Sequence, residues 1–195
     1  MTVDLARSFY SRSVHEVAPE LLNKVLVGPN GSGRIVEVEA YGGAADPGSH
    51  SFRGITPRTE VMHGPAGHLY VYFTYGMHWC ANVVTDPDGR AGAVLLRALA
   101  PLGDLDSMFA ARAKARRPID LCSGPAKLCQ ALGIDGAMHG LDLVEGAAAV
   151  TILDDGTAPP NSPGVSTRIG LSAGQDLPWR YYVTGEPNLS RKSPP

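Results

Sequence analysis

The chain has 195 residues, of which 44% are hydrophobic and 18% are charged, and its formal net charge is −2 at pH 7. This length suits one well-buried domain over 1–195 and is short for two domains of typical size, for which no linker is visible. The weak negative charge argues mildly against a nucleic-acid binder with a basic surface overall. No apolar run approaches the roughly 20 residues that are needed to span a bilayer, so we expect no membrane segment.

The start of the chain and its cysteines bear on the compartment and on metals. A basic segment followed by an apolar one is missing at the start, so we expect no signal peptide and a cytoplasmic protein. The three cysteines are an odd number, which favours reduced thiols, and Cys122 and Cys129 lack the spacing of zinc ligands. We therefore expect no metal site.

Local signals predict short helices and strands, in keeping with 23 glycines and 16 prolines. Ser13 and Glu16 have capping-box spacing, which predicts a helix through residue 22 with Pro19 in its first turn. Next in chain order we predict a hairpin of strands 24–27 and 34–41, a Gly- and Pro-rich loop over 42–68, a second hairpin of strands 69–75 and 78–85, and a strand over 93–99. Helices over 104–116 and 123–133 follow, then strands over 150–153, 167–171 and 180–184. Residues 155–165 are expected to form a polar loop and 188–195 a frayed tail.

The strand over 34–41 carries an unusual face. Side chains alternate along a strand, so Glu37, Glu39 and Tyr41 share one face, while Val36 and Val38 lie on the core face. Two like charges on one face repel, and a buried unpaired carboxylate is costly. Two interpretations stay open on this segment: a sheet edge with two solvated acids, or a general base beside an aromatic stacking platform.

The second hairpin is rich in aromatic residues, although only 7% of the chain is aromatic. Tyr70 and Tyr72 share a strand face, and Tyr75 precedes Gly76 near the tip of the hairpin. A hydrophobic cover over the sheet would explain this pattern, and so would a wedge that enters a base stack. Two platforms, Tyr41 and Tyr72, with a carboxylate and a histidine would suit a flipped nucleobase, because stacking contributes about 1–3 kcal/mol per base.

Several separate segments resemble the alkyladenine (3-methyladenine) DNA glycosylases, in order and in approximate spacing, from the first helix to Tyr182. The segments that carry the resemblance are Arg34-Ile-Val-Glu-Val-Glu-Ala-Tyr41, His50-Ser51, Thr56-Pro-Arg58, Leu69-Tyr-Val-Tyr72 with Tyr75-Gly-Met77, Leu95-Leu-Arg-Ala98 and Gly124-Pro-Ala-Lys-Leu-Cys-Gln-Ala-Leu-Gly133. Agreement over this many segments is far more specific than one short motif.

The resemblance implies roles at the reaction centre. Glu39 matches the general base that deprotonates the water attacking C1′ of the deoxyribose, and Arg97 matches the residue that helps to hold this water. Tyr41 and Tyr72 would stack on the flipped base, and His50 would contact the base or its sugar.

The resemblance also implies roles around the pocket. Tyr75 would fill the gap left by the flipped nucleotide, and Asn82 would disfavour the 2-amino group of guanine. Lys127, near a helix start, suits a phosphate contact or plain solvation, and Arg58 is a second candidate for a phosphate contact.

The fold implied is α+β: a single mixed domain with a curved antiparallel β-sheet, a protruding β-hairpin and surrounding short helices. The implied protein acts as a monomer on double-stranded DNA that contains damaged purines, in the cytoplasm of a bacterial-type cell. It is monofunctional, with no lyase step, and it uses no metal or other cofactor. The implied substrates are 3-methyladenine and, without a ranking from sequence, 7-methylguanine, hypoxanthine and etheno-adenine.

Two other functions stay open on the residues alone. A hydrolase of free nucleosides could use Glu37 and Glu39 as an acid/base pair, about 7 Å apart along the strand, and it would have no use for Tyr75. A non-catalytic nucleic-acid-binding module could use the tyrosines as stacking platforms. A local basic cluster could form a basic face for binding nucleic acid, or it could be the solvated surface of a helix. Its members are Arg112, Lys114, Arg116 and Arg117.

Overall fold

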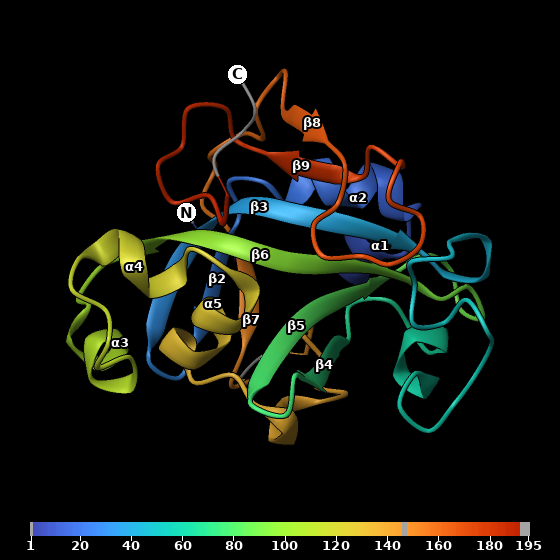
Figure 1. Cartoon of the computed structure of the whole chain (residues 1–195), viewed down its shortest axis with the longest axis horizontal. Coiled ribbons are helices and arrows are strands. Elements are labelled where there is room, and N and C mark those ends of the chain that lie inside the picture. Colours follow the sequence, from blue (N-terminus) through green and yellow to red (C-terminus); the bar gives the residue numbers. More distant parts are fainter. Residues whose placement is uncertain (1, 146–147, 192–195) are drawn as a thin grey trace.

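The computed structural model describes residues 2–145 and 148–191, and it is built around one large sheet (Figure 1). The strands are β1 (Val3–Asp4), β2 (Val25–Gly28), β3 (Gly31–Gly42), β4 (Leu69–Thr74), β5 (His78–Thr85), β6 (Gly92–Leu102), β7 (Thr151–Asp154), β8 (Gly164–Ser166) and β9 (Arg180–Tyr182). They pair antiparallel in the order β1-β7-β2-β3-β6-β5-β4, with β9 on β3 and β8 on β9. The sheet is open, and with its short helices it confirms the α+β class.

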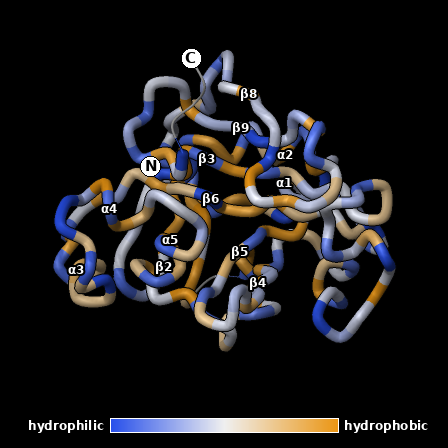
Figure 2. The backbone as a smooth tube through the Cα atoms, in the orientation of Figure 1, coloured by the Kyte–Doolittle hydropathy of each residue, from blue (hydrophilic) through white to orange (hydrophobic). Residues whose placement is uncertain are grey.

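The helices are short and lie around the sheet. They are α1 (Arg7–Tyr10), α2 (Val14–Leu21), α3 (Asp106–Ala111), α4 (Pro118–Cys122) and α5 (Pro125–Leu132), with 3₁₀ turns η1 (Gly43–Ala45), η2 (Glu60–His63) and η3 (Gly136–Met138). Helix α2 packs against β3 and β6, and α5 packs against β5 and β6. Figure 2 shows hydrophobic residues gathered along the central strands and hydrophilic ones in the outer loops.

Helix α2 begins where the sequence predicts, but Pro19 lies elsewhere in it. The side chain of Ser13 accepts a hydrogen bond from the backbone N–H of His15, and the helix buries Val14, Val17 and Leu21 at a helical spacing. The helix starts at Val14, directly after the Ser13 cap. Pro19 is therefore the sixth of its eight residues, and the prediction that Pro19 lies in the first turn is wrong.

The two helices predicted after β6 differ in outcome. Helix α5 has Pro125 at its first position and left-handed Gly133 (φ 74°) at its end, as predicted. The helix expected over 104–116 covers only Asp106–Ala111. Arg112 leaves helical geometry (φ −126°, ψ 66°) because its guanidinium donates to the backbone oxygen of Leu121 at 2.9 Å, which ties it to α4.

Both predicted hairpins form, while two predictions near the C-terminus are wrong. Residues 167–171 are not a strand, and β8 lies at Gly164–Ser166, where it overlaps the end of the loop expected over 155–165. Gly170 is left-handed (φ 79°), and the N–H of Ile169 bonds to a side chain instead of a neighbouring strand. Ser190 is hydrogen-bonded to a buried glutamate, so 188–191 is not frayed. The rest of that predicted tail, 192–195, lies outside the described residues.

Strand β3 positions the site because it pairs on both sides, with β6 on one and with β2 and β9 on the other. A sheet-edge interpretation of Glu37 and Glu39 is therefore wrong, and both side chains are fully buried. The pairing with β6 shifts register around Glu37, between Ile35 and Val38. Such bulges re-aim side chains and often occur beside active sites.

Candidate active site

A cavity of about 390 Å³ lies over the middle of the sheet, between β3–β6, the β4–β5 hairpin and the loops at 48–50 and 169–171. Six of the residues that the sequence singled out line it together: Tyr41, His50, Tyr72, Tyr75, Asn82 and Arg97. Small-molecule pockets usually measure about 300–1,000 Å³, so this one is large enough for a small aromatic ligand.

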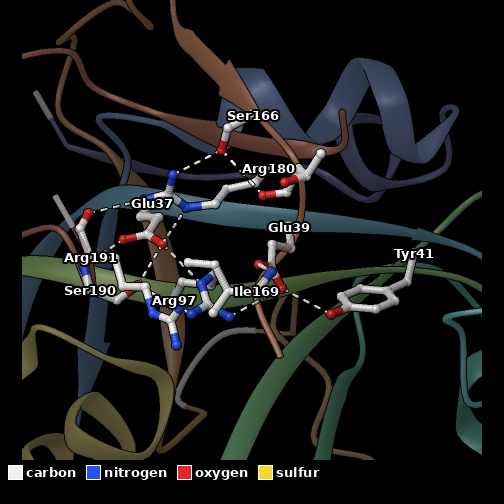
Figure 3. A network of polar contacts seen from close by, with 10 residues as sticks. Glu37, Glu39, Tyr41, Arg97, Ser166, Ile169, Arg180, Ser190 and Arg191 are labelled. Carbon is white, nitrogen blue, oxygen red and sulfur yellow. Dashed lines mark hydrogen bonds and ion pairs between the residues drawn. The ribbon is translucent and has the colours of Figure 1, made fainter. Parts of the chain in front are cut away.

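Glu39 lies behind this cavity and has no exposed surface. Its Oε1 accepts the backbone N–H of Ile169 at 2.7 Å, and its Oε2 accepts the hydroxyl of Tyr41 at 2.9 Å (Figure 3). Nη1 of Arg97 lies 3.1 Å from the same Oε2. A carboxylate oxygen offers two acceptor positions, and the described residues fill one of the two on Oε1, so Glu39 can accept a further hydrogen bond there.

Glu37 is buried as completely as Glu39, and it accepts four hydrogen bonds. Its Oε1 lies 2.9 Å from Nε of Arg97, 2.8 Å from Nε of Arg180 and 2.6 Å from Oγ of Ser190, and its Oε2 accepts the N–H of Ser190 at 2.6 Å. Burial by itself would raise the pKa of Glu37, but the hydrogen bond from Arg180 and the charge of Arg97 outweigh it and lower the pKa below its ordinary value. Glu37 is therefore a buried anion held by two guanidiniums and by Ser190.

The two carboxylates and two guanidiniums form a buried cluster of zero formal charge (Figure 3). Arg97 bridges Glu37 and Glu39, and Arg180 contacts Glu37. Balance of this kind is what keeps ionised groups tolerable in an interior, since a buried unpaired charge is very costly.

Tyr41 joins the cluster to the cavity. Burial, and then the neighbouring charge of Glu39, raise the pKa of its hydroxyl far above the ordinary value, so the hydroxyl stays protonated and donates to Glu39. The guanidinium of Arg168 lies 4.6 Å from the centre of the Tyr41 ring and covers one face. The other face is the one available to a ligand in the cavity.

On the opposite wall, His50 forms a chain of polar contacts with Tyr70 and Arg58. Nε of Arg58 donates to the Tyr70 hydroxyl at 3.2 Å, and this hydroxyl lies 2.9 Å from Nδ1 of His50. Because the Tyr70 proton is free to point at Nδ1, we assign the His50 proton to Nε2. Burial, and then the charge of Arg58, lower the pKa of His50 to about 4, so the ring is neutral at physiological pH.

Tyr72 completes the aromatic wall. Its ring stacks on Tyr70 with centroids 5.6 Å apart and meets His50 edge-on at 4.6 Å. The amide of Asn82 donates to the backbone oxygen of Tyr70 at 3.0 Å, which fixes the orientation of this pocket side chain. The fixed amide and the aromatic rings give the cavity a rigid, mainly apolar wall.

Tyr75 protrudes at the tip of the β4–β5 hairpin and is 82% exposed. Tyr75 and Gly76 have φ of 52° and 65°, and the N–H of Met77 bonds to the oxygen of Thr74, which is a type I′ turn. A bulky residue with positive φ is an outlier that costs about 1–2 kcal/mol. Because nothing in the fold requires a large aromatic at this exposed position, the strain points to a function outside the folded chain.

Comparison with known proteins agrees with this geometry. Residues 8–187 match the model of the methylpurine-DNA glycosylase family. The chain belongs to this family. It is 55% identical over 189 residues to a protein of Burkholderia cenocepacia (strain HI2424), covering 96% of this chain and 91% of the relative. It is 49% identical over 193 residues to a protein of Carboxydothermus hydrogenoformans, covering 96% and 99%. Both relatives are named as predicted 3-methyladenine DNA glycosylases.

Family membership makes the protein a DNA glycosylase, an enzyme that hydrolyses N-glycosyl bonds in DNA. It thus excludes the non-catalytic binding module. Within the described residues, no helix is both long and apolar enough to cross a membrane. The same residues contain no group of three or more His, Cys, Asp and Glu side chains that could hold a metal ion.

Two residues predicted to contact phosphate lie outside the lining of the cavity. Arg58 is exposed, but its guanidinium is directed at Tyr70 and lies 5.6 Å from the centre of the Tyr72 ring. Lys127 is exposed on α5, and its Nζ donates to Oγ of Ser123 at 3.1 Å. Arg58 therefore supports the aromatic wall, while the surroundings of Lys127 suit both phosphate contact and solvation.

Four contributors to the candidate site had no role in the sequence-based prediction: Arg168, Ile169, Arg180 and Ser190. Ile169 acts through its backbone N–H, which every residue except proline has, so no sequence signal marks it. The arginines could have been sought as partners once two acids were expected inside the protein, because buried carboxylates require cations or several donors.

Proposed function

We propose that this glycosylase hydrolyses the N-glycosidic bond of alkylated or deaminated purines in double-stranded DNA, with Glu39 as the general base. The observation that carries this proposal is the contrast between the two buried glutamates. Among the described residues, Oε1 of Glu39 accepts one hydrogen bond and so keeps an acceptor position, and the partners of Glu39 all line the cavity. Arg180 and Ser190, which bind Glu37, do not line it. A general base needs a free acceptor position to accept a proton from water.

In the proposed reaction, a water bound at Glu39 attacks C1′ of the flipped nucleotide. The new C1′–O bond forms as the C1′–N bond breaks, the bonding electrons leave with the base, and the water proton passes to Glu39. The negative charge of the Glu39 carboxylate would also stabilise the positive charge that develops on the sugar in the transition state. A cationic alkylated purine already leaves easily, so positioning of water and sugar supplies much of the catalysis.

The cavity walls support recognition of a flipped base. The open face of Tyr41 and the ring of Tyr72 offer stacking surfaces, and an electron-poor or cationic base gains from contact with aromatic faces. Neutral His50 would offer its Nε2 proton to an acceptor on the base or sugar. The set of lesions proposed is 3-methyladenine, 7-methylguanine, hypoxanthine and etheno-adenine.

Two further parts of the proposal are a monofunctional reaction and action as a monomer. Among the described residues that line the cavity there is no lysine, the residue type that would form a Schiff base with the sugar. The residues proposed for base binding and water activation all come from one chain. A hydrolase that uses Glu37 and Glu39 as an acid/base pair is disfavoured, because two arginines hold Glu37 as an anion.

The proposal sets one requirement on the bound state. Glu39 is shielded from the cavity by its own partners Tyr41, Arg97 and Ile169, which do line it. Water must therefore reach Oε1 beside Ile169 when the nucleotide enters. The loop that carries Ile169 is the element that would move to admit it, since Tyr41 and Arg97 extend from paired strands.

The test is base release from a duplex with one hypoxanthine, run beside methylated genomic DNA. Wild-type protein is expected to release the free base and to leave an abasic strand that breaks only after alkali treatment. Release from methylated DNA alone would narrow the substrates to alkylated bases. Strand cleavage without alkali would contradict the monofunctional reaction, and no release from either substrate would contradict the proposal.

Tyr75→Gly is expected to stabilise the protein and to impair it on duplex DNA. Glycine adopts φ 52° without strain, so the free energy of unfolding should rise by roughly 0.5–1 kcal/mol. Loss of the wedge should slow excision from a duplex far more than from a single strand, where no stack must be filled. Denaturant unfolding and excision on both substrates measure the two effects. Equal activity on duplex DNA would show that Tyr75 is no wedge.

His50 is expected to titrate near pH 4 in the folded protein, measured by the NMR shift of its ring proton. The ordinary pKa of histidine is about 6.5, so the unfolded chain binds this proton first as the pH falls. The contribution of His50 to stability is therefore fully present above about pH 6.5 and declines as the pH falls toward 4. Titration near 6.5 would contradict the lowering of the pKa by burial and by Arg58, and a His50→Gln spectrum assigns the signal.

A further inference from the structure

The last described residues of the chain return to the buried charge cluster. Ser190 bonds to both oxygens of Glu37, from its N–H to Oε2 and from its hydroxyl to Oε1, each at 2.6 Å (Figure 3). Next to it, the backbone oxygen of Arg191 accepts from Nη2 of Arg180 at 3.3 Å, and Arg191 lines the cavity. The C-terminal segment is thus a wall of the site and is tied to its acids.

Ser190 also contacts the arginine that faces the proposed base. Nε of Arg97 donates to Glu37 at 2.9 Å, and Nη2 of Arg97 donates to Oγ of Ser190 at 3.2 Å. The Ser190 hydroxyl therefore accepts from Arg97 while it donates to Glu37, which uses its one proton and one lone pair.

A guanidinium is planar and rigid, so two fixed nitrogens determine where the third one points. In Arg97 the third nitrogen is Nη1, which lies 3.1 Å from Oε2 of Glu39. Glu37 and Ser190 therefore aim Arg97 at Glu39 without touching either Glu39 or the space beside its free acceptor position.

We propose that Ser190 is a positioning residue which, with Glu37, holds Arg97 in the orientation that serves Glu39, so that the C-terminal segment completes the catalytic centre. This inference rests on the proposed roles of Glu39 and Arg97. It differs from a merely structural role, in which Ser190 only fastens the end of the chain and its loss lowers stability without a separate effect on the chemical step.

The test compares Ser190→Ala, Ser190→Thr and the matched control Ser166→Ala in single-turnover excision with enzyme in excess. Ser166 lies outside the cluster and does not line the cavity; its hydroxyl accepts from Nη1 of Arg180 at 2.9 Å and does not contact Glu37 or Arg97. Ser190→Ala keeps the backbone bond to Glu37, so it is expected to fold. Its single-turnover rate should fall about 10- to 100-fold, the scale of a small misplacement in an active site.

The accompanying measurements separate positioning from stability. The Kd of Ser190→Ala for lesion DNA should stay within about twofold of wild type, Ser190→Thr should restore most of the rate, and Ser166→Ala should keep it. A wild-type rate in Ser190→Ala, or equal losses of rate and thermal stability in both alanine variants, would overturn the inference. Glu39→Gln is assayed in parallel: if it is active, the proposed role of Glu39 as general base fails, whereas an inactive Glu39→Gln beside a fully active Ser190→Ala removes only the role of Ser190.

Discussion

Glu39→Gln is expected to lower the single-turnover rate of base excision by about 10²- to 10⁴-fold, the usual contribution of a general base. Glutamine keeps the size of the side chain but cannot take a proton from water. Its amide oxygen can still accept from Tyr41 and Arg97, while its NH₂ group then faces the N–H of Ile169. Affinity for lesion DNA should be retained, because the stacking surfaces do not change.

The control for this change is Glu16→Gln, which removes one carboxylate from the exposed surface of α2 and should leave excision unchanged. Rate, Kd for a hypoxanthine duplex and thermal unfolding are measured for both variants. Normal turnover by Glu39→Gln would refute the role of general base. A loss of rate that follows a loss of folded protein would assign Glu39 to the structure instead of the chemistry.

The elements predicted from the sequence succeed where the signal is local. Capping by Ser13, the left-handed end at Gly133 and the turn at Gly76 each depend on a few adjacent residues, and all three are present. The helix expected over 104–116 ends early because Arg112 bonds to Leu121 on α4, which lies beyond the end of the predicted helix. Tertiary contacts override weak local preference in this way.

At the candidate site, too, the residues that were predicted are those with a local signal or a match to the family, and those that were missed are remote partners. Alternation along one strand placed Glu39 and Tyr41 together, the aromatic density of the second hairpin marked Tyr72 and Tyr75, and the resemblance added roles for His50, Asn82 and Arg97. The burial of Glu39 depends on β9, a strand of three residues that pairs with β3 across more than 140 positions of the chain. The partners of the acids are as remote: Ile169 is 130 residues from Glu39, and Ser190 is 153 from Glu37. One sequence carries no signal for such pairs.

Arg168→Leu is expected to reduce the free energy of unfolding by about 3–5 kcal/mol, the typical result of breaking a buried ion pair from one side. The side chains of Arg168 and Asp46 are both fully buried, and their contacts are 2.5 and 2.7 Å. Burial would raise the pKa of Asp46, but the hydrogen bonds from Arg168 and the backbone outweigh it and lower the pKa. The stability from this carboxylate is thus present above about pH 4 and is lost as the pH falls further.

Denaturant unfolding checks this value, with Glu20→Gln as the control. Glu20 forms an ion pair with Arg12 in which both side chains are at least a third exposed, and such pairs contribute at most about 1 kcal/mol. Adding Asp46→Asn to Arg168→Leu should recover part of the loss, since it removes the unpaired charge. Equal effects of Arg168→Leu and Glu20→Gln would contradict the argument.

The same change should also lower excision in the protein that remains folded. Arg168 covers the back of the Tyr41 ring and precedes Ile169, whose N–H bonds to Glu39. Losing Arg168 therefore loosens one stacking surface and one of the two hydrogen bonds to the proposed base. Excision per folded molecule, measured well below the unfolding temperature, should fall in Arg168→Leu and stay at the wild-type rate in Glu20→Gln. If both variants kept the wild-type rate, the ion pair would support the fold alone.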